Sequence, residues 1–323
     1  MTAASGSPAR VAVVGIHGHG ASHVRRTQQL AAAGLATLAA VADPRRADEG
    51  AIEDSVREFD SLADLLDDVE VDVIIICTPI HTHFALTKLA FEAGVDVLLE
   101  KPPVTSSADF TELLRISRDT GRRCQVGFQA LASGALPLIE EALGRGEIGT
   151  VTGVSANGRW VRRRSYWERA AWAGKRVLNG IDVVDGVLTN PLAHAVSMAL
   201  KLAGASRGAD VASVELDQYR ANDFIECDDT SVVRVRTTAG LPVTVALTLA
   251  ATRDSEPFVT VHGTSGRIVF FYKLDTVQIF SAGQETPTTL HTPERHLLDN
   301  LLDVRAGRAD SLVADLADNE GFT

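Results

Sequence analysis

Residues 11–24, with the sequence VAVVGIHGHGASHV, decide the fold class of this chain. An apolar run ends at Gly15, and a short turn rich in glycine and histidine leads into a helical pattern from Ala21. A buried strand, a glycine turn and a helix in this order are typical of a phosphate-binding turn in a parallel sheet. The dinucleotide pattern G-x-G-x-x-G has a glycine where this chain has His17. Three interpretations follow: a cofactor loop, a histidine metal site, or the relic of a cofactor loop that has lost its ligand.

The first part of the chain alternates strand and helix patterns, which indicates a parallel sheet. Consecutive Val, Ile and Leu residues predict strands that are buried on both faces. The predicted strands are Arg10–Gly15, Leu38–Asp43, Val71–Cys77, Val95–Glu100 and Arg123–Phe128. The predicted helices are Ala21–Ala33, Leu62–Asp68, His81–Ala93, which Gly94 ends, and Ser106–Thr120, which starts with a serine cap and an acidic first turn.

From Phe128 onward the pattern changes to a helix, a polar aromatic segment, a second helix over Pro191–Leu202 and then a series of short strands. These strands are predicted at Val211–Tyr219, Thr230–Thr237, Val243–Leu249, Phe258–His262, Ile268–Tyr272 and Val277–Phe280. Strands that follow one another without helices indicate a mostly antiparallel sheet. We therefore expect one domain over residues 1–128 and a second domain, of α+β type, over residues 129–323.

Composition excludes several classes of protein. The net charge is -11 and no long basic stripe is present, so nucleic-acid binding is not expected. No apolar run approaches the roughly 20 residues of a membrane span, and the polar N-terminus lacks the apolar core of a secretion signal. The three cysteines are widely spaced, which is typical of reduced thiols. We expect a cytoplasmic protein without nucleic-acid or membrane partners.

The residues of the turn have separate predicted roles. Gly15 permits the tight bend after the strand, and Gly20 permits close packing of helix against strand. Asp43 ends the next strand, where a carboxylate hydrogen-bonds the ribose 2′-OH of NAD. Arg45 and Arg46 follow it and could accept a 2′-phosphate, so NAD is expected and NADP stays an alternative.

The histidines could instead bind a metal ion. His17, His19 and His23 are close in sequence, and His81 and His83 follow further on. A metal site needs three or four convergent ligands, usually with a carboxylate or a thiolate. Because the spacing shows no such set, no metal is expected. The histidines are then ordinary loop or packed helix residues.

Two later segments fall at the carboxyl edge of the predicted sheet, where open α/β folds bind ligands. Thr78–Pro79 ends the third predicted strand, and Glu100-Lys101-Pro102-Pro103 follows the fourth. Lys101 comes directly after a buried strand and before two prolines. A functional role is favoured over that of a surface lysine in a turn.

These segments together resemble the glucose–fructose oxidoreductase/inositol dehydrogenase (Gfo/Idh/MocA) family. The resemblance rests on Gly15, Gly18, Gly20 and His23, on VADP at 41–44, on CTPIHTHFALTKLAFEAG at 77–94 and on EKP at 100–102. It continues through TVHGTSGRIVF at 260–270 and HLLDNLLDVRAG at 296–307. It implies an N-terminal Rossmann domain with a doubly wound parallel sheet. It also implies a C-terminal α+β domain with a large, mostly antiparallel open sheet.

The resemblance also implies catalytic residues. In the family a D-x-x-x-H segment on a helix faces the nicotinamide, with the lysine of EKP opposite. His194 and Lys101 match this pair, and Asn190 stands where the family has aspartate. The spacing of four places Asn190 and His194 on one helix face, and Asn190 before Pro191 is a predicted helix cap. His194 is then the base, and Lys101 stabilises the developing alkoxide.

The segment WVRRRSYWERAAWAGK at 160–175 contains all three tryptophans of the chain. It is either a solvated basic stretch or a lid whose aromatic faces stack on a sugar ring. The family resemblance favours the lid. The expected substrate-binding residues are Asn190, Arg162, Tyr166, Arg169 and Trp172. The expected cofactor-binding residues are Gly15, Ile16, His17, Gly18, His19, Gly20, Asp43, Thr78, Pro79, His83, Glu100 and Lys101.

The expected activity is hydride transfer between nicotinamide and a secondary alcohol of a sugar, a cyclitol or a derivative. Two alternatives stay open, because Asn190 replaces aspartate and His17 replaces glycine. The first is a lyase or hydrolase that uses NAD transiently, and the second is a non-catalytic sensor of sugar or NAD. A homodimer or homotetramer is expected through the C-terminal sheet. Residues 312–323 resemble the start of the family's last helix, so the chain could be a trimmed or a short form.

Overall fold

The structure is a computed structural model that describes residues 7–323. Residues 1–6, on which the expectation about a secretion signal partly rests, lie outside the described residues. The chain divides into two compact units. Unit 1 contains the residues up to Gly127 together with Leu297–Leu316, and unit 2 contains Phe128–His296 together with Ala317–Thr323. The expected second domain, 129–323, included residues 297–316, which instead pack in unit 1.

Unit 1 is built on a six-stranded parallel sheet with the strand order β3-β2-β1-β4-β5-β6. This order reverses direction beside β1, so the sheet is doubly wound as expected. Every residue of β4 and β5 is buried, which explains their consecutive apolar residues. The strands are β1 (Ala9–Val14), β2 (Ala36–Ala42), β3 (Arg57–Phe59), β4 (Val73–Ile76), β5 (Asp96–Leu99) and β6 (Cys124–Val126).

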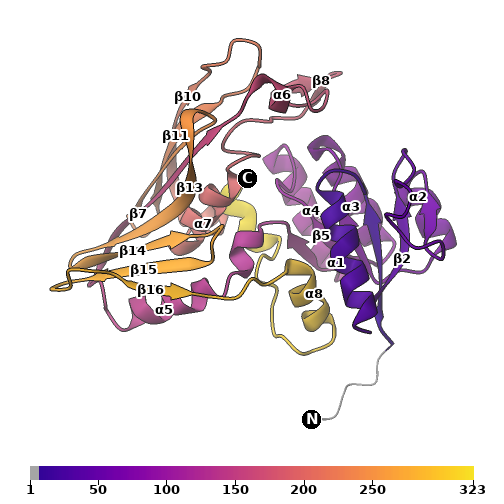
Figure 1. The fold of residues 1–323 in the computed structure, drawn as a ribbon, viewed down its shortest axis with the longest axis horizontal. Coiled ribbons are helices and arrows are strands. Elements are labelled where there is room, and N and C mark those ends of the chain that lie inside the picture. Colours follow the sequence, from indigo (N-terminus) through magenta and orange to yellow (C-terminus); the bar gives the residue numbers. More distant parts are fainter. Residues whose placement is uncertain (1–6) are drawn as a thin grey trace. The chain divides into compact units, whose positions relative to one another are not determined.

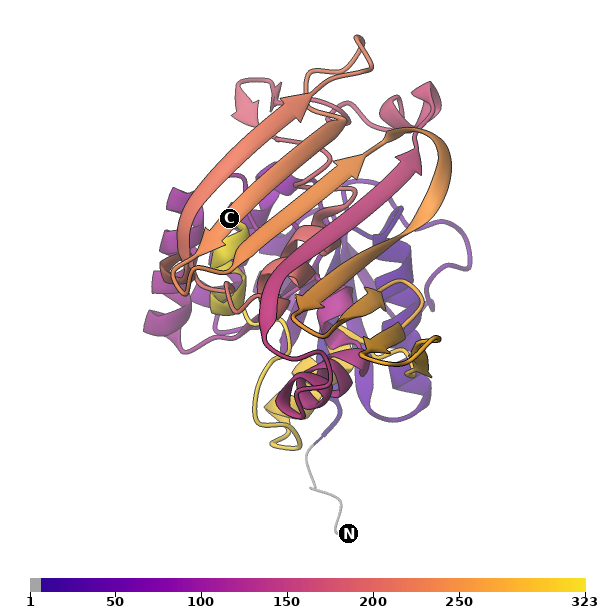
Figure 2. The same ribbon diagram turned by 90° about the vertical axis from the view of Figure 1, so that its left-hand side faces the viewer.

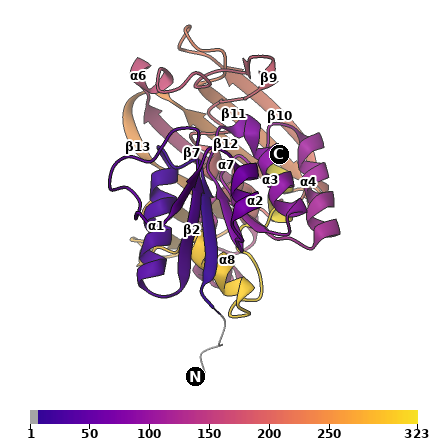
Figure 3. The ribbon, with the colours of Figure 1, turned by 90° about the vertical axis from the view of Figure 1, so that its right-hand side faces the viewer.

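Helices flank this sheet (Figure 3). Ser106 caps α4 by accepting a hydrogen bond from the Asp109 amide, and Gly94 has the positive φ of a residue that ends a helix. Both features were predicted. The helix predicted from His81 begins as a 3-10 turn, and its α-helical part starts at His83. The helices are α1 (Gly20–Ala32), α2 (Leu62–Asp68), η1 (Ile80–Thr82), α3 (His83–Glu92), α4 (Ser107–Thr120) and α8 (Leu297–Arg305).

The segment 297–316 completes the sheet of unit 1. The amide of Val126 in β6 donates to Ala314 O, and the amide of Leu316 donates to Cys124 O. Within α8, Arg305 pairs with Asp96, a carboxylate without solvent exposure at the start of β5. The end of the chain therefore covers the edge strand β6, whose backbone groups would otherwise be unpaired.

Unit 2 is built on an eight-stranded sheet with the order β10-β11-β12-β7-β13-β14-β15-β16 (Figure 2). All neighbouring strands are antiparallel except β12 and β7. This confirms the expected mostly antiparallel open sheet. The strands are β7 (Val151–Val161), β10 (Val211–Tyr219), β11 (Thr230–Thr237), β12 (Pro242–Thr248), β13 (Ala250–Gly263), β14 (Gly266–Phe271), β15 (Thr276–Ser281) and β16 (Thr288–His291).

Helix α7 packs against the central strands of this sheet (Figure 1). The remaining elements of unit 2 are η2 (Gln129–Ala132), α5 (Ala135–Gly144), α6 (Arg164–Trp167), β8 (Val177–Leu178), β9 (Ile181–Asp182), α7 (Ala193–Leu202), η3 (Gly208–Asp210) and η4 (Ala317–Phe322). Among the described residues no helix is both long and apolar enough to cross a bilayer. The homo-oligomer expected through this sheet stays a prediction.

Candidate active site

The turn after β1 needs two glycines for steric reasons. Gly15 has a φ of +82°, and a Cβ at this position would lie 2.3 Å from the carbonyl oxygen of Cys77. A Cβ on Gly20 would lie 1.8 Å from the carbonyl oxygen of Gly15. The bend and the close helix packing that the sequence predicts are therefore both present. The amides of Gly15, Ile16 and Gly20 donate to Ala42 O, Asp43 and His17 O, and the loop leads into the N-terminus of α1.

Asp43 and His17 lie together beside this turn. The Asp43 carboxylate accepts hydrogen bonds from the amides of Ile16 (3.0 Å) and Arg45 (2.9 Å). His17 Nε2 lies 3.2 Å from Arg45 O and 3.9 Å from Asp43 Oδ1. The imidazole thus packs toward the end of β2. Asp43 is held at the carboxyl edge of the sheet, as expected for a ribose ligand.

His83 contacts the two other loops at the carboxyl edge of the unit 1 sheet, the loop after β4 and the loop after β5. Its Nδ1 lies 2.8 Å from Pro102 O and its Nε2 lies 3.0 Å from Thr78 O. The side chain is buried, and burial lowers the pKa of His83 more than the two carbonyl oxygens raise it. Because the ring lies beneath the loops, we interpret His83 as a positioning residue for Thr78 and for the segment after β5, rather than as a cofactor contact.

The Glu100 carboxylate contacts two imidazole side chains. His23 Nε2 lies 2.9 Å and His19 Nε2 lies 3.3 Å from the same oxygen, Glu100 Oε1. Burial would raise the pKa of Glu100, but its contacts with His19 and His23 hold that pKa well below its usual range. The hydrogen bond to Glu100 in turn raises the pKa of His19. The spacing in the sequence showed no convergent ligand set, whereas the structure brings this one together.

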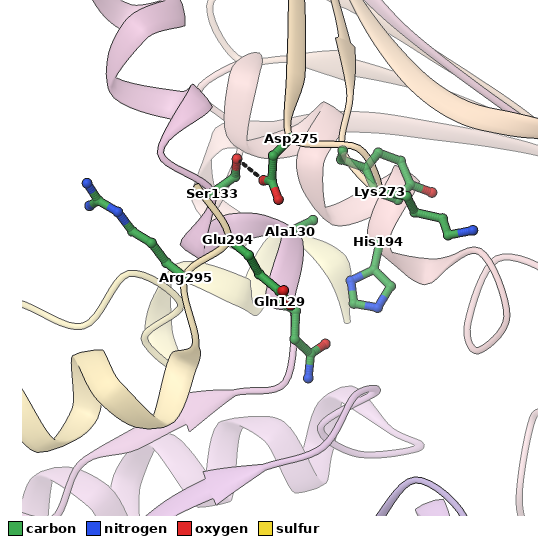
Figure 4. A pocket seen from close by; sticks show the side chains of 9 residues that line it. Gln129, Ala130, Ser133, His194, Lys273, Asp275, Glu294 and Arg295 are labelled. Atoms are coloured by element: carbon green, nitrogen blue, oxygen red, sulfur yellow. Dashed lines mark hydrogen bonds between the residues drawn. The ribbon is translucent and has the colours of Figure 1, made fainter. Parts of the chain in front are cut away.

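His194, the expected base, lies in unit 2 near the start of α7. Its ring stands edge-on to Phe128, with a centroid distance of 5.8 Å, and 6.3 Å from the ring of Tyr272. His194 lines a pocket of about 290 Å³ together with charged and polar side chains (Figure 4). The lining residues are Gln129, Ala130, Ser133, His194, Tyr272, Lys273, Asp275, Glu294 and Arg295.

Tyr272 is a pocket residue that sequence reasoning missed. Its side chain is buried, and its hydroxyl has no hydrogen-bonding partner among the residues that the structure describes. Burial also raises the pKa of Tyr272, so the hydroxyl stays protonated and can donate. The sequence signal is that Tyr272 follows the apolar run of β14. A tyrosine hydroxyl buried at such a position usually has a hydrogen-bonding partner.

The prediction that Asn190 caps the helix of His194 is wrong. Helix α7 starts at Ala193, and Asn190 lies in the turn before it. Instead, Asn190 Nδ2 donates to Asp185 Oδ1 at 2.6 Å. Asn190 and His194 therefore do not share one helix face, because the helix starts at Ala193, two residues later than the predicted start at Pro191.

Asp185 contacts two of the predicted substrate-binding residues of unit 2, Asn190 and Arg169. It has no solvent exposure, and it accepts a hydrogen bond from the amide of Gly174 at 2.7 Å in addition to that from Asn190. Arg169 Nη2 lies 3.6 Å from Asp185 Oδ2, the oxygen that also accepts from the Gly174 amide. Sequence reasoning did not single out Asp185, because an aspartate between Val184 and Gly186 reads as a turn residue.

The aromatic and basic residues of the 160–175 segment form one stack. The Arg169 guanidinium lies 3.8 Å from the ring centroid of Tyr166 and 4.7 Å from that of Trp172. The Arg162 guanidinium lies 5.1 Å from the Tyr166 centroid and 4.5 Å from that of Trp160. These cation–π contacts hold the segment in a defined conformation. The structure thus brings Arg162, Tyr166, Arg169 and Trp172 together.

Two models of one protein family match this chain. A model described as an oxidoreductase family with an NAD-binding Rossmann fold matches residues 9–128. A model described as the GFO/IDH/MocA C-terminal domain matches residues 138–269. The chain belongs to the Gfo/Idh/MocA family. The resemblance stated from the sequence is thereby confirmed.

Curated relatives of this Gfo/Idh/MocA chain include dehydrogenases. Inositol 2-dehydrogenase 1 of Saccharopolyspora erythraea is 34% identical over 143 residues, which cover 43% of this chain and 42% of that protein. The match thus spans about two fifths of that relative's length. Levoglucosan dehydrogenase of Pseudarthrobacter phenanthrenivorans is 25% identical over 272 residues, which cover 76% of this chain and 67% of that protein.

Solved structures share the fold over almost the whole chain. The WlbA dehydrogenase of Bordetella pertussis, in complex with NADH and UDP-GlcNAcA, has a TM-score of 0.80 at 22% identity. The match covers 98% of this chain and 93% of that chain. At this identity the likeness shows that the Gfo/Idh/MocA fold is common to both.

Proposed function

We propose that this chain is an NAD(P)-dependent dehydrogenase or reductase that acts on a secondary alcohol of a sugar, a cyclitol or a derivative. The observation that carries the proposal is the polar pocket around His194 in a chain whose other unit has an NAD-binding Rossmann fold. Side chains of both charges line this pocket, so they can hydrogen-bond several hydroxyl groups at once. The printed names of the relatives, inositol and levoglucosan dehydrogenases, support the same substrate class.

The turn after β1 fits a dinucleotide. A Cβ on Gly15 or on Gly20 would collide with backbone oxygens, whereas Gly18 has no neighbouring atom within 4 Å of such a Cβ. Gly15 and Gly20 are thus packed against the protein backbone, whereas the space beside Gly18 is open. The amides of residues 17–19 would bind the pyrophosphate, because those of Gly15, Ile16 and Gly20 already donate within the protein. Asp43 would accept a hydrogen bond from a ribose hydroxyl. The carboxylate favours NAD over NADP, because it repels a 2′-phosphate.

The side chains then have the following roles in turnover. Bound NAD would supply the ring that exchanges the hydride with the carbon of the alcohol. His194 takes the proton of the alcohol hydroxyl, because an imidazole is the side chain that most often acts as a general base. Lys101 hydrogen-bonds the alcohol oxygen and stabilises its developing negative charge. Asn190 orients a further hydroxyl but cannot relay a proton, and the aromatic stack of residues 162–172 covers the sugar.

The test is a substrate panel read by NADH or NADPH formation. It contains myo-inositol, levoglucosan and UDP-GlcNAcA, each with NAD+ and with NADP+. We expect stoichiometric reduced cofactor with at least one compound, and faster turnover with NAD+. Consumption of a sugar without net reduced cofactor would favour the transient-redox alternative. A full panel without turnover, and without thermal stabilisation by either cofactor, would contradict the proposal.

Two substitutions test the assigned roles. His194→Gln should lower kcat by roughly 10²–10⁴-fold, the range for loss of a general base. Lys101→Met should lower it by roughly 10²–10³-fold, the range for loss of an oxyanion donor. The matched controls are His262→Gln and Lys88→Met, which change exposed residues and should retain activity. Equal activity of the test variants and their controls would remove His194 and Lys101 from the mechanism.

A further inference from the structure

Three side chains that bind transition metals converge beside the turn after β1. His19 and His23 are four residues apart at the start of α1, and Glu100 follows β5 directly. Their ligand atoms all lie within 4.8 Å of one another. The spacing of four places both imidazoles on one side of the helix start, facing the end of the neighbouring strand.

The separations from Glu100 Oε1 to the two imidazole nitrogens are close to those of a tetrahedral site. Zinc binds imidazole nitrogen and carboxylate oxygen at about 2.0–2.2 Å, so two ligand atoms of a tetrahedral ion lie about 3.4 Å apart. Glu100 Oε1 lies 3.3 Å from His19 Nε2 and 2.9 Å from His23 Nε2. These two separations differ from the tetrahedral value by a few tenths of an ångström, and the two imidazole nitrogens lie within 4.8 Å of each other.

The surroundings suit an ion that enters from solvent. The side chains of His23 and Glu100 are 12% and 8% exposed, while that of His19 is 59% exposed, so the cluster is fixed at its base and open at its rim. Glu100 Oε2 accepts a hydrogen bond from the Lys101 amide at 3.2 Å, which orients the carboxylate. Such a contact to a ligating carboxylate is a typical part of a metal site.

The geometry points to a zinc site in which His19 Nε2, His23 Nε2 and Glu100 Oε1 bind one Zn²⁺, with water in the fourth position. Two imidazoles and one carboxylate are a ligand set that zinc accepts with an open position. The site shares His19 and Glu100 with the expected cofactor-binding residues, but its test requires neither cofactor nor substrate. The competing interpretation is that these groups only hydrogen-bond one another.

Direct metal binding tests this site without an activity assay. The full-length chain is stripped with a chelator, and Zn²⁺ is titrated against a chromogenic chelator in the absence of NAD. We expect one equivalent to bind. With Co²⁺ as a probe, the intense visible absorption of a four-coordinate ion should develop at the same stoichiometry.

Variants identify the ligands. His19→Ala removes an exposed side chain, so it should leave the fold unchanged, and it should weaken Zn²⁺ binding at least about 100-fold, since even loss of a supporting contact costs 10–100-fold. Glu100→Gln should do the same. The matched control is His17→Ala, which lies on the same loop but contacts Arg45 O, and it should bind as the parent does. The zinc site is refuted if the parent binds no stoichiometric Zn²⁺, or if His19→Ala and His17→Ala bind it equally.

Discussion

At the scale of single residues, the buried hydroxyl of Tyr272 is the clearest sign that the His194 pocket binds a polar ligand. A buried hydroxyl without a hydrogen bond costs about 1–3 kcal/mol. Within the described chain no group accepts from it or donates to it, yet it lines a pocket with His194, Gln129 and several charged side chains. A ligand hydroxyl placed there would recover this energy, so Tyr272 contributes to binding at the expense of stability.

Tyr272→Phe should separate these two effects. It removes a hydrogen bond to the ligand worth about 1 kcal/mol, so kcat/KM should fall roughly 3- to 10-fold through KM. The thermal stability of the free protein should stay equal or rise, because an unsatisfied polar group is lost. The control is Tyr219→Phe on the exposed edge of the sheet. A fall in stability with unchanged KM would assign Tyr272 a purely structural role.

Residues whose role is steric or local could be predicted from the sequence, and residues whose role depends on distant partners could not. Gly20, the Ser106 cap and the positive φ of Gly15 were predicted because they are decided within a few neighbouring residues. The close approach of Cys77 O to Gly15 was not, because it depends on a distant strand. Asp185 accepts hydrogen bonds from Asn190 and from the Gly174 amide, which is 11 residues away in sequence. No local sequence pattern predicts that these groups meet.

At the scale of elements, α3 positions the loops at the carboxyl edge of the unit 1 sheet. Its first residue, His83, contacts Thr78 O before the helix and Pro102 O after β5. A neutral imidazole carries one N–H and can donate to one of these carbonyls at a time. Because burial lowers its pKa, His83 stays neutral in the native state where the unfolded chain would already bind a proton.

This difference predicts a pH dependence of stability. Since the unfolded chain binds more protons below its ordinary pKa of 6.5, the contribution of His83 is complete above that pH and is lost as the pH falls below it. The free energy of unfolding should therefore fall more steeply with acid in the parent than in His83→Gln, by up to about 1.4 kcal/mol per pH unit. Urea titrations at several pH values measure this. Parallel pH curves for the two proteins would contradict the lowered pKa.

Long apolar elements were predicted to within a few residues, whereas short or polar ones were missed. Helix α2 has the predicted bounds, Leu62–Asp68, and β11 has the predicted bounds, Thr230–Thr237. β3 and β16 contain three and four residues, too few for a visible alternation. The start of α7 was placed too early because Pro191 suits a first helical turn, but a turn that contains Asn190 occupies that position.

At the scale of the whole molecule, each of the two units is made of two segments that are separate in the sequence. Residues 297–316 return to unit 1 after most of unit 2, and Ala317–Thr323 then complete unit 2. Arg305 in this segment contacts both Asp96, which has no solvent exposure, and Asp72. The sequence pattern could not predict this return, because an amphipathic helix does not specify which sheet it will cover.

Arg305→Leu should destabilise unit 1. After the substitution the buried Asp96 carboxylate keeps the more distant Arg123 guanidinium, at 3.3 Å, as its cation. The cost should therefore stay below the roughly 3 kcal/mol of a fully unpaired buried charge. The control is Arg308→Leu, whose partner Asp303 is exposed, and it should change stability by less than about 1 kcal/mol. Amide hydrogen exchange in β5 and β6 is the suitable measurement, because all three tryptophans lie in unit 2 and fluorescence does not report on unit 1. Equal exchange in both variants would contradict the structural role of Arg305.

The pairing of β6 with residues 314–316 also has a consequence for biosynthesis. A ribosome makes β6 long before it makes Ala314, so the nascent N-terminal sheet emerges with an open edge. An exposed strand edge is a template for pairing with other chains, including those on neighbouring ribosomes. The β6 edge is covered only when translation has passed Leu316. We therefore expect a chain that is truncated before Ala314 to aggregate more readily than one that extends past Leu316.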